Sequence, residues 1–375
     1  MLNSNELKVL QIIKENPFIT QNDIGKELGL NRSTVATIIS SLGEKNIILG
    51  RSYILKEETS AVYCIGGINV DRKYNLIGDL VEGTSNPAHS QVFVGGVGRN
   101  VAENLGRLGH DPYMISVGGY DQDFEFIKKK SQDFINFQYV KQLHDYSTGS
   151  YSAVLNGEGE MQFAISVMEV LNEMDVKFIS AFQTILKDAK LIVVDLNLPL
   201  ETVEYLTEFS RSREIDLVII PVSSPKMKNL PKSLDGVKWI IVNQDESESF
   251  FGVKIKSDED FDNLIDNWLE TGVEQVIVTR GKNYSVYGNN KGKRLKFFPP
   301  MTDNVIDVTG AGDSYSAGVI HGHLLGLSPE ETIEYAMTNA FYTIQTDSTV
   351  REDLNKNKLE EQKNSLKEKG LFKWS

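Results

Sequence analysis

Hydrophobic residues recur along the chain with two different periods, and the change falls near residue 60. In residues 6–15 leucine, isoleucine and valine repeat at the spacing of one helix face, and Asn16-Pro17 ends the pattern. This first segment therefore predicts a short amphipathic helix.

Two further short helices are predicted before residue 46. Thr20 is a suitable N-cap for a helix that ends at Gly29, and Asn31 is a suitable N-cap for a helix over residues 32–45. Three helices with a glycine-containing turn before the third resemble a helix-turn-helix, and residues 47–55 are long enough for two strands of a wing. We therefore predict an all-α, winged helix-turn-helix domain over residues 1–57.

From residue 60 onward, short apolar strands alternate with amphipathic helices. This rhythm is typical of a mostly parallel sheet with helices on both faces, a three-layer α/β/α domain, here expected over residues 60–350. The strands are predicted at residues 61–65, 111–117, 191–195, 217–221, 239–242 and 275–279, and the helices at 101–108, 200–213 and 257–270.

Two segments interrupt this rhythm. Residues 72–94 and 149–166 alternate apolar and polar side chains, and the second contains a hairpin signal at residues 156–159. We expect them to form a small separate sheet that acts as a lid over the main one. The tail, residues 351–375, is rich in charge and is expected to be a helical, solvated end.

Composition narrows the class of protein. The 375 residues contain one cysteine and five scattered histidines, which excludes a disulfide framework and a cysteine-based zinc site. No apolar run reaches 18 residues, so we expect a cytoplasmic protein without a membrane partner. The net charge is −13, but residues 1–56 carry seven Lys or Arg against five Asp or Glu. The first segment is therefore the one suited to nucleic acid.

The third helix offers candidate DNA contacts at its start. Arg32, Ser33, Thr34 and Thr37 lie where short polar side chains and one guanidinium can reach base edges or phosphates. The alternative is a small dimerisation domain in which these residues only cap a helix. An excess of two positive charges is a small electrostatic footprint for DNA binding.

Residues 304–319 contain the strongest candidates for catalytic residues. Gly310, Ala311 and Gly312 precede a predicted helix, so their N–H groups lie at its positive end and form an anion site. Asp313 in the first turn is placed to accept a proton from an attacking hydroxyl. Without other signals, the same spacing would also suit a helix-capping turn.

The surrounding motifs supply those signals. The stretch from Asp307 to Asp313 resembles the C-terminal signature of the ribokinase-like pfkB family of carbohydrate kinases, and Gly95-Gly96-Val97-Gly98-Arg99-Asn100 resembles the N-terminal one. The resemblance covers residues 60–350 and implies an ATP-dependent kinase with a ribokinase-like fold. It also implies sugar-hydroxyl contacts from Gly95, Gly96 and Asn100; a helix N-cap is the alternative role for Asn100.

Further positions follow from the same resemblance. Asn69 and Asp71, which share one side of a strand end, are expected to bind sugar hydroxyls. Nucleotide and Mg²⁺ contacts are implied for Asn243, Glu246 (through water), Thr279, Gly281 and Asn339, and a monovalent cation such as K⁺ is implied at Asp307 and Thr309. For Asn339 a buried polar helix residue is an equal alternative.

The stretch before Gly95, together with Asp195-Leu196-Asn197 and Pro221-Val222-Ser223, is similar to bacterial pseudouridine kinases. This similarity implies phosphorylation of a nucleoside 5′-hydroxyl, with Asn197 as a ribose or base contact or else a loop cap. Another nucleoside or a ribose-like sugar stays open, because pocket shape decides it. A regulator that only senses a nucleoside is the alternative from another class, and a homodimer is expected.

Overall fold

The structure is a computed structural model that describes residues 2–45, 47–48 and 61–375. The first part contains α1 (Ser4–Glu15), α2 (Gln21–Leu28) and α3 (Arg32–Glu44). Thr20 and Asn31 cap α2 and α3 with their side chains, as predicted. A small core of its own holds the three helices together: Val9, Ile12, Ile13, Ile24, Val35, Ile38, Leu42 and Ile48. Most of the predicted wing lies outside the described residues.

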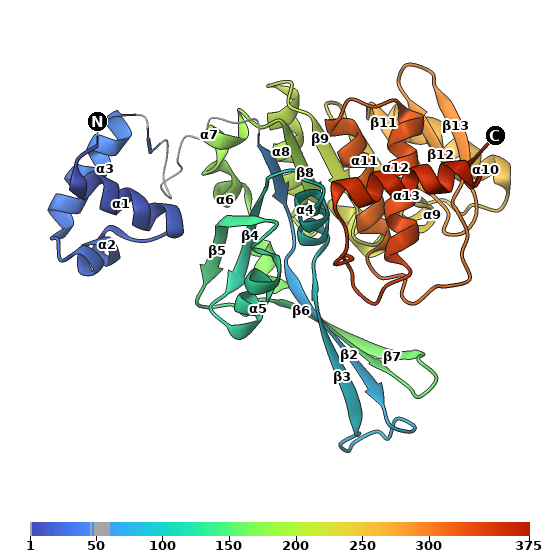
Figure 1. The fold of residues 1–375 in the computed structure, drawn as a ribbon, viewed down its shortest axis with the longest axis horizontal. Coiled ribbons are helices and arrows are strands. Elements are labelled where there is room, and N and C mark those ends of the chain that lie inside the picture. The colour runs from blue at the N-terminus through green and yellow to red at the C-terminus, as the bar shows by residue number, and fades with distance from the viewer. Residues whose placement is uncertain (1, 46, 49–60) are drawn as a thin grey trace.

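The second part is built on a large mixed sheet (Figure 1). Seven neighbouring strands are parallel, and three antiparallel strands extend one edge. These three strands and the parallel strand at the opposite edge, Asn136–Leu143, were not foreseen from the sequence. In spatial order the described strands are β14 (Lys373–Trp374), β13 (Arg294–Phe298), β12 (Ser285–Asn289), β11 (Gln275–Thr279), β10 (Trp239–Asn243), β9 (Leu217–Ile220), β8 (Leu191–Asp195), β1 (Val62–Ile65), β4 (Pro112–Gly119) and β5 (Asn136–Leu143).

Helices cover both faces of this sheet because the parallel strands are apolar on both sides. Within β1, for example, Val62 and Cys64 belong to one buried cluster, whereas Tyr63 and Ile65 belong to the other. The first cluster includes α4 (Val97–Arg107), α5 (Gln122–Ser131), α11 (Ala311–Leu324) and α12 (Pro329–Thr343). The second includes η1 (Glu169–Glu173), α6 (Val176–Ser180), α7 (Gln183–Leu186), α8 (Leu200–Arg211), η2 (Ser224–Asn229), α9 (Gln244–Phe251) and α10 (Asp258–Glu270). The predicted three-layer α/β/α class is confirmed.

A separate four-stranded sheet projects from the domain, and it contains both predicted lid segments (Figure 1). This sheet is called the lid below. Its strands, in spatial order, are β3 (Ala88–Gly95), β2 (Asn69–Leu76), β6 (Gly149–Leu155) and β7 (Met161–Val167). Asn69 and Asp71 lie at the start of β2, which is the root of the lid.

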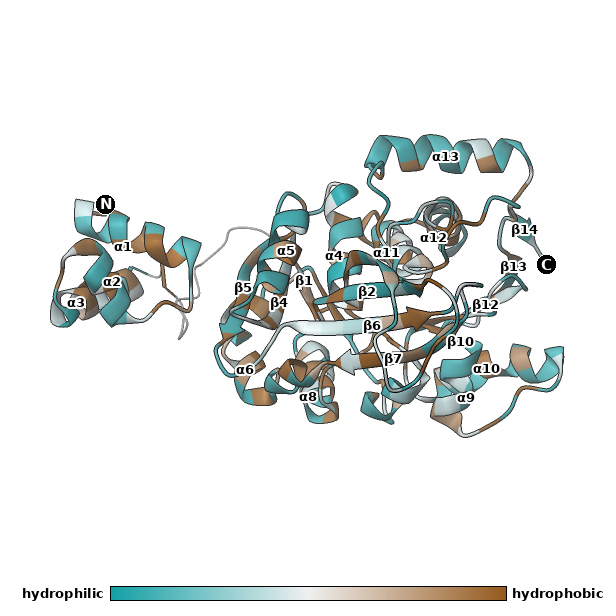
Figure 2. Cartoon of the chain, turned by 90° about the horizontal axis from the view of Figure 1, so that it is seen from below, coloured by the Kyte–Doolittle hydropathy of each residue, from teal (hydrophilic) through white to brown (hydrophobic). Residues whose placement is uncertain are grey.

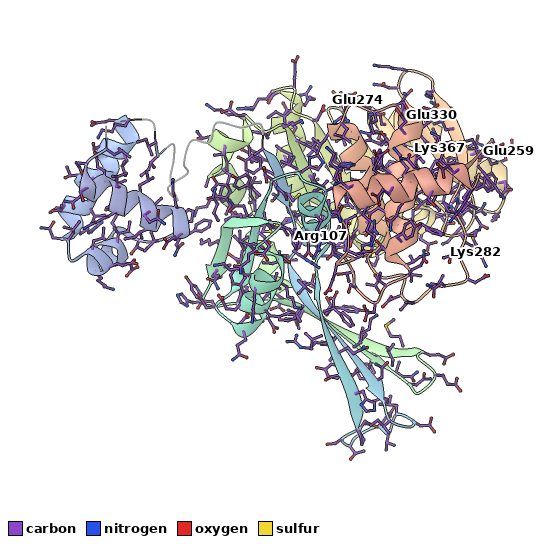
Figure 3. All side chains as sticks on the ribbon, viewed as in Figure 1. Arg107, Glu259, Glu274, Lys282, Glu330 and Lys367 are labelled. Atoms are coloured by element: carbon purple, nitrogen blue, oxygen red, sulfur yellow. The ribbon has the colours of Figure 1, made fainter. Side chains whose placement is uncertain are left out.

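The tail differs from the expectation of a solvated end. It is helical as expected, since α13 spans Lys356–Glu368, but Leu359 and Leu366 are buried against the domain and β14 adds an edge strand to the main sheet. Lys367, labelled in Figure 3, pairs with Glu334 of α12 at 3.1 Å. Among the charged residues of α13, Lys356, Glu361, Lys367 and Glu368 are exposed, whereas Glu360 and Lys363 contact Tyr335 of α12. Two leucines seven residues apart complete the inner side.

No helix among the described residues is both long and apolar enough to cross a membrane.

Candidate active site

The start of α11 lies where the anion turn is predicted. Gly310 is the N-cap with a φ of +81°, and a Cβ there would come within 2.1 Å of the Thr349 carbonyl oxygen, so only glycine fits. A Cβ on Gly312 would meet nothing within 4 Å. Of the first-turn N–H groups, that of Ala311 donates to the Val308 carbonyl oxygen at 3.2 Å. Those of Gly312 and Asp313 have no acceptor within the helix, and they are therefore available to an anion.

Asp313 lies in this first turn and is connected to the N-terminal motif. Its Oδ2 accepts a hydrogen bond from Asn100 Nδ2 at 2.6 Å. Burial raises the pKa of Asp313 to about 6, and the negative charges of Asp195 and Asp71 act in the same direction, against the lowering effect of Asn100 and Arg99. A carboxyl group with this pKa is a suitable general base near neutral pH.

Asn100 has its orientation fixed by Arg99. The buried Arg99 guanidinium donates to Asn100 Oδ1, and it is itself ion-paired with Glu103 at 2.5 Å. The Asn100 amide group therefore points its N–H at Asp313. Helix α4 begins four residues earlier than predicted, because Gly96 with φ of +96° precedes it, and Asn100 lies inside the helix instead of capping it. The predicted hydroxyl contact of Asn100 stays a prediction.

Asn69 and Asp71 meet at the root of the lid as predicted from their spacing. Asn69 Nδ2 donates to Asp71 Oδ1 at 2.6 Å. A Cβ on Gly95 would lie 2.2 Å from Asp71 Oδ2, so this glycine lets the two strands approach around the carboxylate. Burial raises the pKa of Asp71 to about 6, although Arg99, Asn69 and Lys73 lower it.

Asp195 is a site residue to which sequence reasoning assigned no role. Its buried carboxylate accepts N–H bonds from Gly67 at 2.8 Å, Gly98 at 2.8 Å and Asn197 at 2.9 Å. It thus joins the ends of β1 and β8 to the start of α4. The signal available in the sequence was an acidic residue at the end of a fully apolar strand. Asn197 is nine-tenths buried beside Gly67 and does not line the cavity next to Asp313, so its substrate contact stays a prediction.

A cavity of about 580 Å³ lies next to the anion turn. Gly312 and Asp313 line it together with four of the predicted nucleotide-side residues: Asn243, Glu246, Thr279 and Gly281. The rest of its wall is mainly apolar and includes Pro221, Val242, Met337 and Phe341. The structure therefore brings a hydrophobic slot, an anion turn and a raised-pKa carboxyl group into one space.

Asn243 and Glu246 form a reciprocal capping box at the start of α9. Asn243 Oδ1 accepts the Glu246 N–H, and Glu246 Oε2 accepts the Asn243 N–H, both at 2.8 Å. Burial raises the pKa of Glu246 to about 7, with Asp245 and Asp313 adding to the rise. A buried carboxylate on the cavity wall beside other negative charge suits a nearby cation. Among the described residues, no group of three His, Cys, Asp or Glu side chains could hold a metal ion, so Mg²⁺ would depend on water and phosphate ligands.

Asn339 is a buried polar residue of helix α12, which is the alternative role considered for it. Its side chain is fully buried, donates to Asn104 Oδ1 at 2.9 Å and to the Ser314 carbonyl at 2.8 Å, and does not line the cavity. It ties α12 to α11 and α4, and the neighbouring Ala340 and Phe341 line the cavity instead. This corrects the expected nucleotide contact, because a core-facing amide cannot reach the cavity from its position on the helix.

Asp307 and Thr309 lie in the turn before Gly310. The Thr309 N–H and hydroxyl donate to Asp307 Oδ1 at 2.9 and 2.6 Å, and Lys73 of the lid approaches Asp307 Oδ2 to 2.5 Å. Lys73 was not singled out from the sequence. It is two residues beyond Asp71 in β2, and its side chain therefore lies on the same face of the strand as those of Asn69 and Asp71.

The start of α3 presents the four candidate DNA contacts. Arg32, Ser33 and Thr37 are exposed, and Thr34 is half-buried. The hydroxyls of Ser33 and Thr34 donate to Asn31 Oδ1 at 2.7 and 2.8 Å, so these two residues also support the N-cap.

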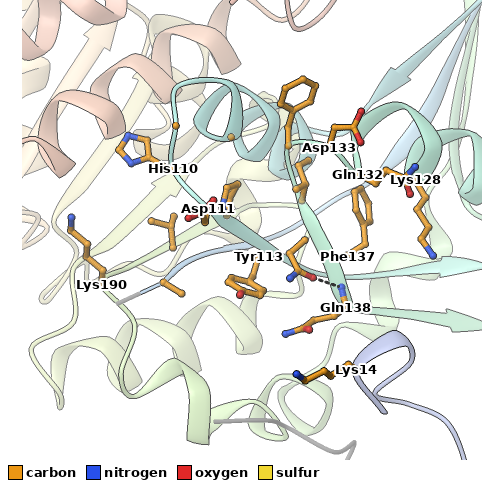
Figure 4. A pocket seen from close by; sticks show the side chains of 18 of the residues that line it. Lys14, His110, Asp111, Tyr113, Lys128, Gln132, Asp133, Phe137, Gln138 and Lys190 are labelled. Carbon is orange, nitrogen blue, oxygen red and sulfur yellow. Dashed lines mark hydrogen bonds between the residues drawn. The ribbon is translucent and has the colours of Figure 1, made fainter. Parts of the chain in front are cut away.

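A separate hollow of about 760 Å³, seen from close by in Figure 4, shares no lining residue with the cavity beside Asp313. Its wall combines Lys14 and Glu15 of α1 with polar residues around His110 and Asp133. His110 Nε2 is hydrogen-bonded to His321 Nδ1 at 2.8 Å, so this histidine has a structural partner.

The three-layer domain, its lid and the glycine turn with an adjacent carboxyl group define a kinase that acts on a carbohydrate-type hydroxyl. Residues 59–356 match the model of the pfkB family carbohydrate kinases, and the chain belongs to this family. Residues 2–48 match the winged helix-turn-helix DNA-binding model, which confirms the class of the first domain.

Individual proteins agree with this assignment. The chain is 29% identical over 342 residues to the Escherichia coli protein "Uncharacterized sugar kinase YeiI", covering 90% of this chain and 93% of that one. It is 26% identical over 298 residues to the pseudouridine kinase of Escherichia coli, covering 79% and 94%. Among solved structures, a carbohydrate kinase from Agrobacterium tumefaciens matches with a TM-score of 0.71 and 25% identity, over 82% of this chain and 97% of that one.

Proposed function

We propose that this protein transfers the γ-phosphoryl group of ATP to the hydroxyl of a nucleoside or sugar, and that its substrate is the 5′-hydroxyl of pseudouridine. The observation that carries the proposal is the position of Asp313. Its carboxyl group lies beside the anion turn of Gly310 to Gly312, and Asn100 connects it to the glycine motif at the root of the lid.

In the proposed reaction the Asp313 carboxylate takes the proton from the attacking hydroxyl. The N–H groups of the anion turn stabilise negative charge on the transferring phosphoryl group, and the low polarity of the cavity strengthens both interactions. Asn69 and Asp71 hold the sugar, and the lid excludes water from the reacting atoms. Asn100 keeps the Asp313 carboxylate oriented while it receives the proton.

Glu246 and Asn243 would hold Mg²⁺ through water. The raised pKa of Glu246 indicates a carboxylate that gains from a nearby positive charge, since protonation is the alternative way to neutralise it. When bound, Mg²⁺ supplies charge neutralisation to the phosphates.

The lid favours a substrate with a flat base. Phe93 and Tyr151 are the register partners of Asp71 on its two neighbouring strands, so all three side chains lie on one face of the lid, the face that carries Asn69. Aromatic side chains beside a sugar-binding carboxylate suit a nucleoside better than a free sugar. Similarity to a pseudouridine kinase supports the specific substrate; another nucleoside or a ribose-like sugar is the alternative.

A substrate panel tests this proposal. ADP formation is measured with pseudouridine, uridine, guanosine, inosine and ribose, with Asp313→Asn as the matched inactive control. The highest kcat/KM is expected for pseudouridine, and a preference for ribose would contradict the nucleoside assignment. Binding of a nucleoside without any ADP formation would instead support the sensor alternative.

We further propose that the first domain binds DNA through Arg32, Ser33, Thr34 and Thr37, which lie at the start of α3. This would place a kinase and a regulator in one chain.

A homodimer is proposed through the outer face of the lid. Val92, Phe163 and Ile165 are 47%, 44% and 57% exposed there, and Figure 2 shows β7 as hydrophobic. A second copy is expected to cover this face, and the mass in solution of Ile165→Lys tests it. A wild-type monomer would contradict the dimer.

A further inference from the structure

The lid forms an ion pair with the main domain on each of its two faces. Arg72 and Lys73 are neighbours in β2, so their side chains point to opposite faces. Arg72 Nη2 lies 2.6 Å from Asp123 Oδ1 of α5, on the outer side. Lys73 Nζ lies 2.5 Å from Asp307 Oδ2, on the side that carries Asn69 and Asp71. The two pairs are similarly exposed, but only the second reaches the site.

Asp307 uses both carboxylate oxygens in these contacts. Oδ1 accepts the N–H and the hydroxyl of Thr309, the residue directly before the N-cap Gly310. Oδ2 accepts from Lys73, whose Nζ also lies 5.5 Å from the centre of the Phe93 ring. The carboxylate therefore links the lid on one oxygen to the anion turn on the other.

A monovalent cation at Asp307 does not fit this arrangement. Such an ion would need a carboxylate oxygen of Asp307, and the Lys73 ammonium group, which carries the same single positive charge, already lies against Oδ2. Lys73 and a dissolved cation thus compete for one position.

We propose that Lys73 is a positioning residue whose ammonium group takes the place of a monovalent cation at Asp307, so that the lid itself completes the anion turn. The proposal rests on the proposed function, in which this turn stabilises the transferring phosphoryl group. It makes the wild-type enzyme independent of K⁺, because its cation is part of the chain.

The test compares Lys73→Met with the matched control Arg72→Met, which breaks the ion pair on the other face. Turnover with ATP and pseudouridine is measured in K⁺ and in tetramethylammonium at equal ionic strength. Wild type and Arg72→Met are each expected to show the same turnover in K⁺ as in tetramethylammonium. Lys73→Met is expected to lose roughly 10- to 100-fold in kcat in tetramethylammonium, the order expected for misplaced reacting groups, and to recover part of it in K⁺.

A second readout does not depend on turnover. The melting temperature with a non-hydrolysable ATP analogue is followed while K⁺ replaces tetramethylammonium. It should rise for Lys73→Met and stay flat for wild type and for Lys73→Arg, which keeps the charge. If no substrate is phosphorylated by wild type, the proposed function fails, and the melting data still decide the role of Lys73.

Two results would overturn the proposal. One is a wild-type enzyme that requires K⁺ or is stabilised by it. The other is a Lys73→Met variant that responds to both salts as Arg72→Met does, which would mean that the contact with Asp307 has no influence on the turn.

Discussion

The carboxyl groups of Asp313 and Asp71 both have pKa values raised to about 6, because burial disfavours their charged forms. A group with a raised pKa holds its proton to higher pH than usual, so the base is inactive below about pH 6 and active above it. We predict that kcat/KM falls on the acid side of an apparent pKa near 6, which belongs to the coupled pair. A pH–rate profile checks this; full activity maintained to pH 4.5 would contradict it.

Asp195 is expected to position both glycine loops of the site. An asparagine at this position keeps one acceptor oxygen but turns an amide group toward backbone N–H donors. Asp195→Asn should therefore lose on the order of 2 kcal/mol in the free energy of unfolding, as hydrogen bonds to a buried charged group do, and should raise KM for the nucleoside more than that for ATP.

Urea unfolding and initial-rate kinetics measure both effects. Asp216→Asn is the control, since Asp216 is a partly exposed carboxylate bonded to His323. It lies at the amino end of β9, whereas the other end of this strand lines the cavity. If Asp195→Asn and Asp216→Asn changed the free energy of unfolding and the KM for the nucleoside equally, the positioning role of Asp195 would be contradicted.

At the scale of elements, α13 shows how a charged segment can be part of the fold. Leu359 is fully buried with Leu108, Tyr335 and Leu354. We predict that Leu359→Ala costs about 3 kcal/mol in the free energy of unfolding, the usual range for a leucine that leaves a cavity. The exposed neighbour Glu361→Ala should change it by less than about 0.5 kcal/mol. Equal unfolding midpoints for the two variants would mean that α13 is not docked.

Periodicity predicted the parallel strands of the main sheet and the lid segments because these are apolar runs or clear alternations. It missed the parallel edge strand β5 and the antiparallel strands β12, β13 and β14, because polar side chains interrupt the apolar runs of these four strands. The site was predictable where chemistry follows from local spacing, as for Asp313 in a first helical turn. It was not predictable for Asp195 and Lys73, because their partners lie about 100 to 230 positions away in the sequence.

The whole molecule combines a kinase with a helix-turn-helix domain that has its own small core. Removal of residues 1–57 should therefore leave kcat within about twofold of the full chain, since the described sheet begins at Val62. A steady-state assay of the truncated protein checks this, and a loss of folding would contradict it.

The same domain should give the full chain salt-sensitive binding to DNA from its own promoter region. Arg32→Ala combined with Thr34→Ala should weaken binding, whereas Lys128→Ala, which removes a positive charge from the kinase domain, should not. Fluorescence anisotropy at several salt concentrations, with and without nucleoside, measures both. Binding no stronger than that of the truncated protein would leave dimerisation as the role of this domain.

The most direct test of the proposed kinase reaction is the product formed from pseudouridine and ATP, followed by phosphorus NMR with wild type and Asp313→Asn. The expected wild-type product is a single monophosphate ester at the 5′-hydroxyl. Asp313→Asn should form it roughly 10²- to 10⁴-fold more slowly while still binding the nucleoside, which is the usual effect of losing a general base. Near-normal turnover of Asp313→Asn, or a phosphate on another hydroxyl, would contradict the proposed chemistry.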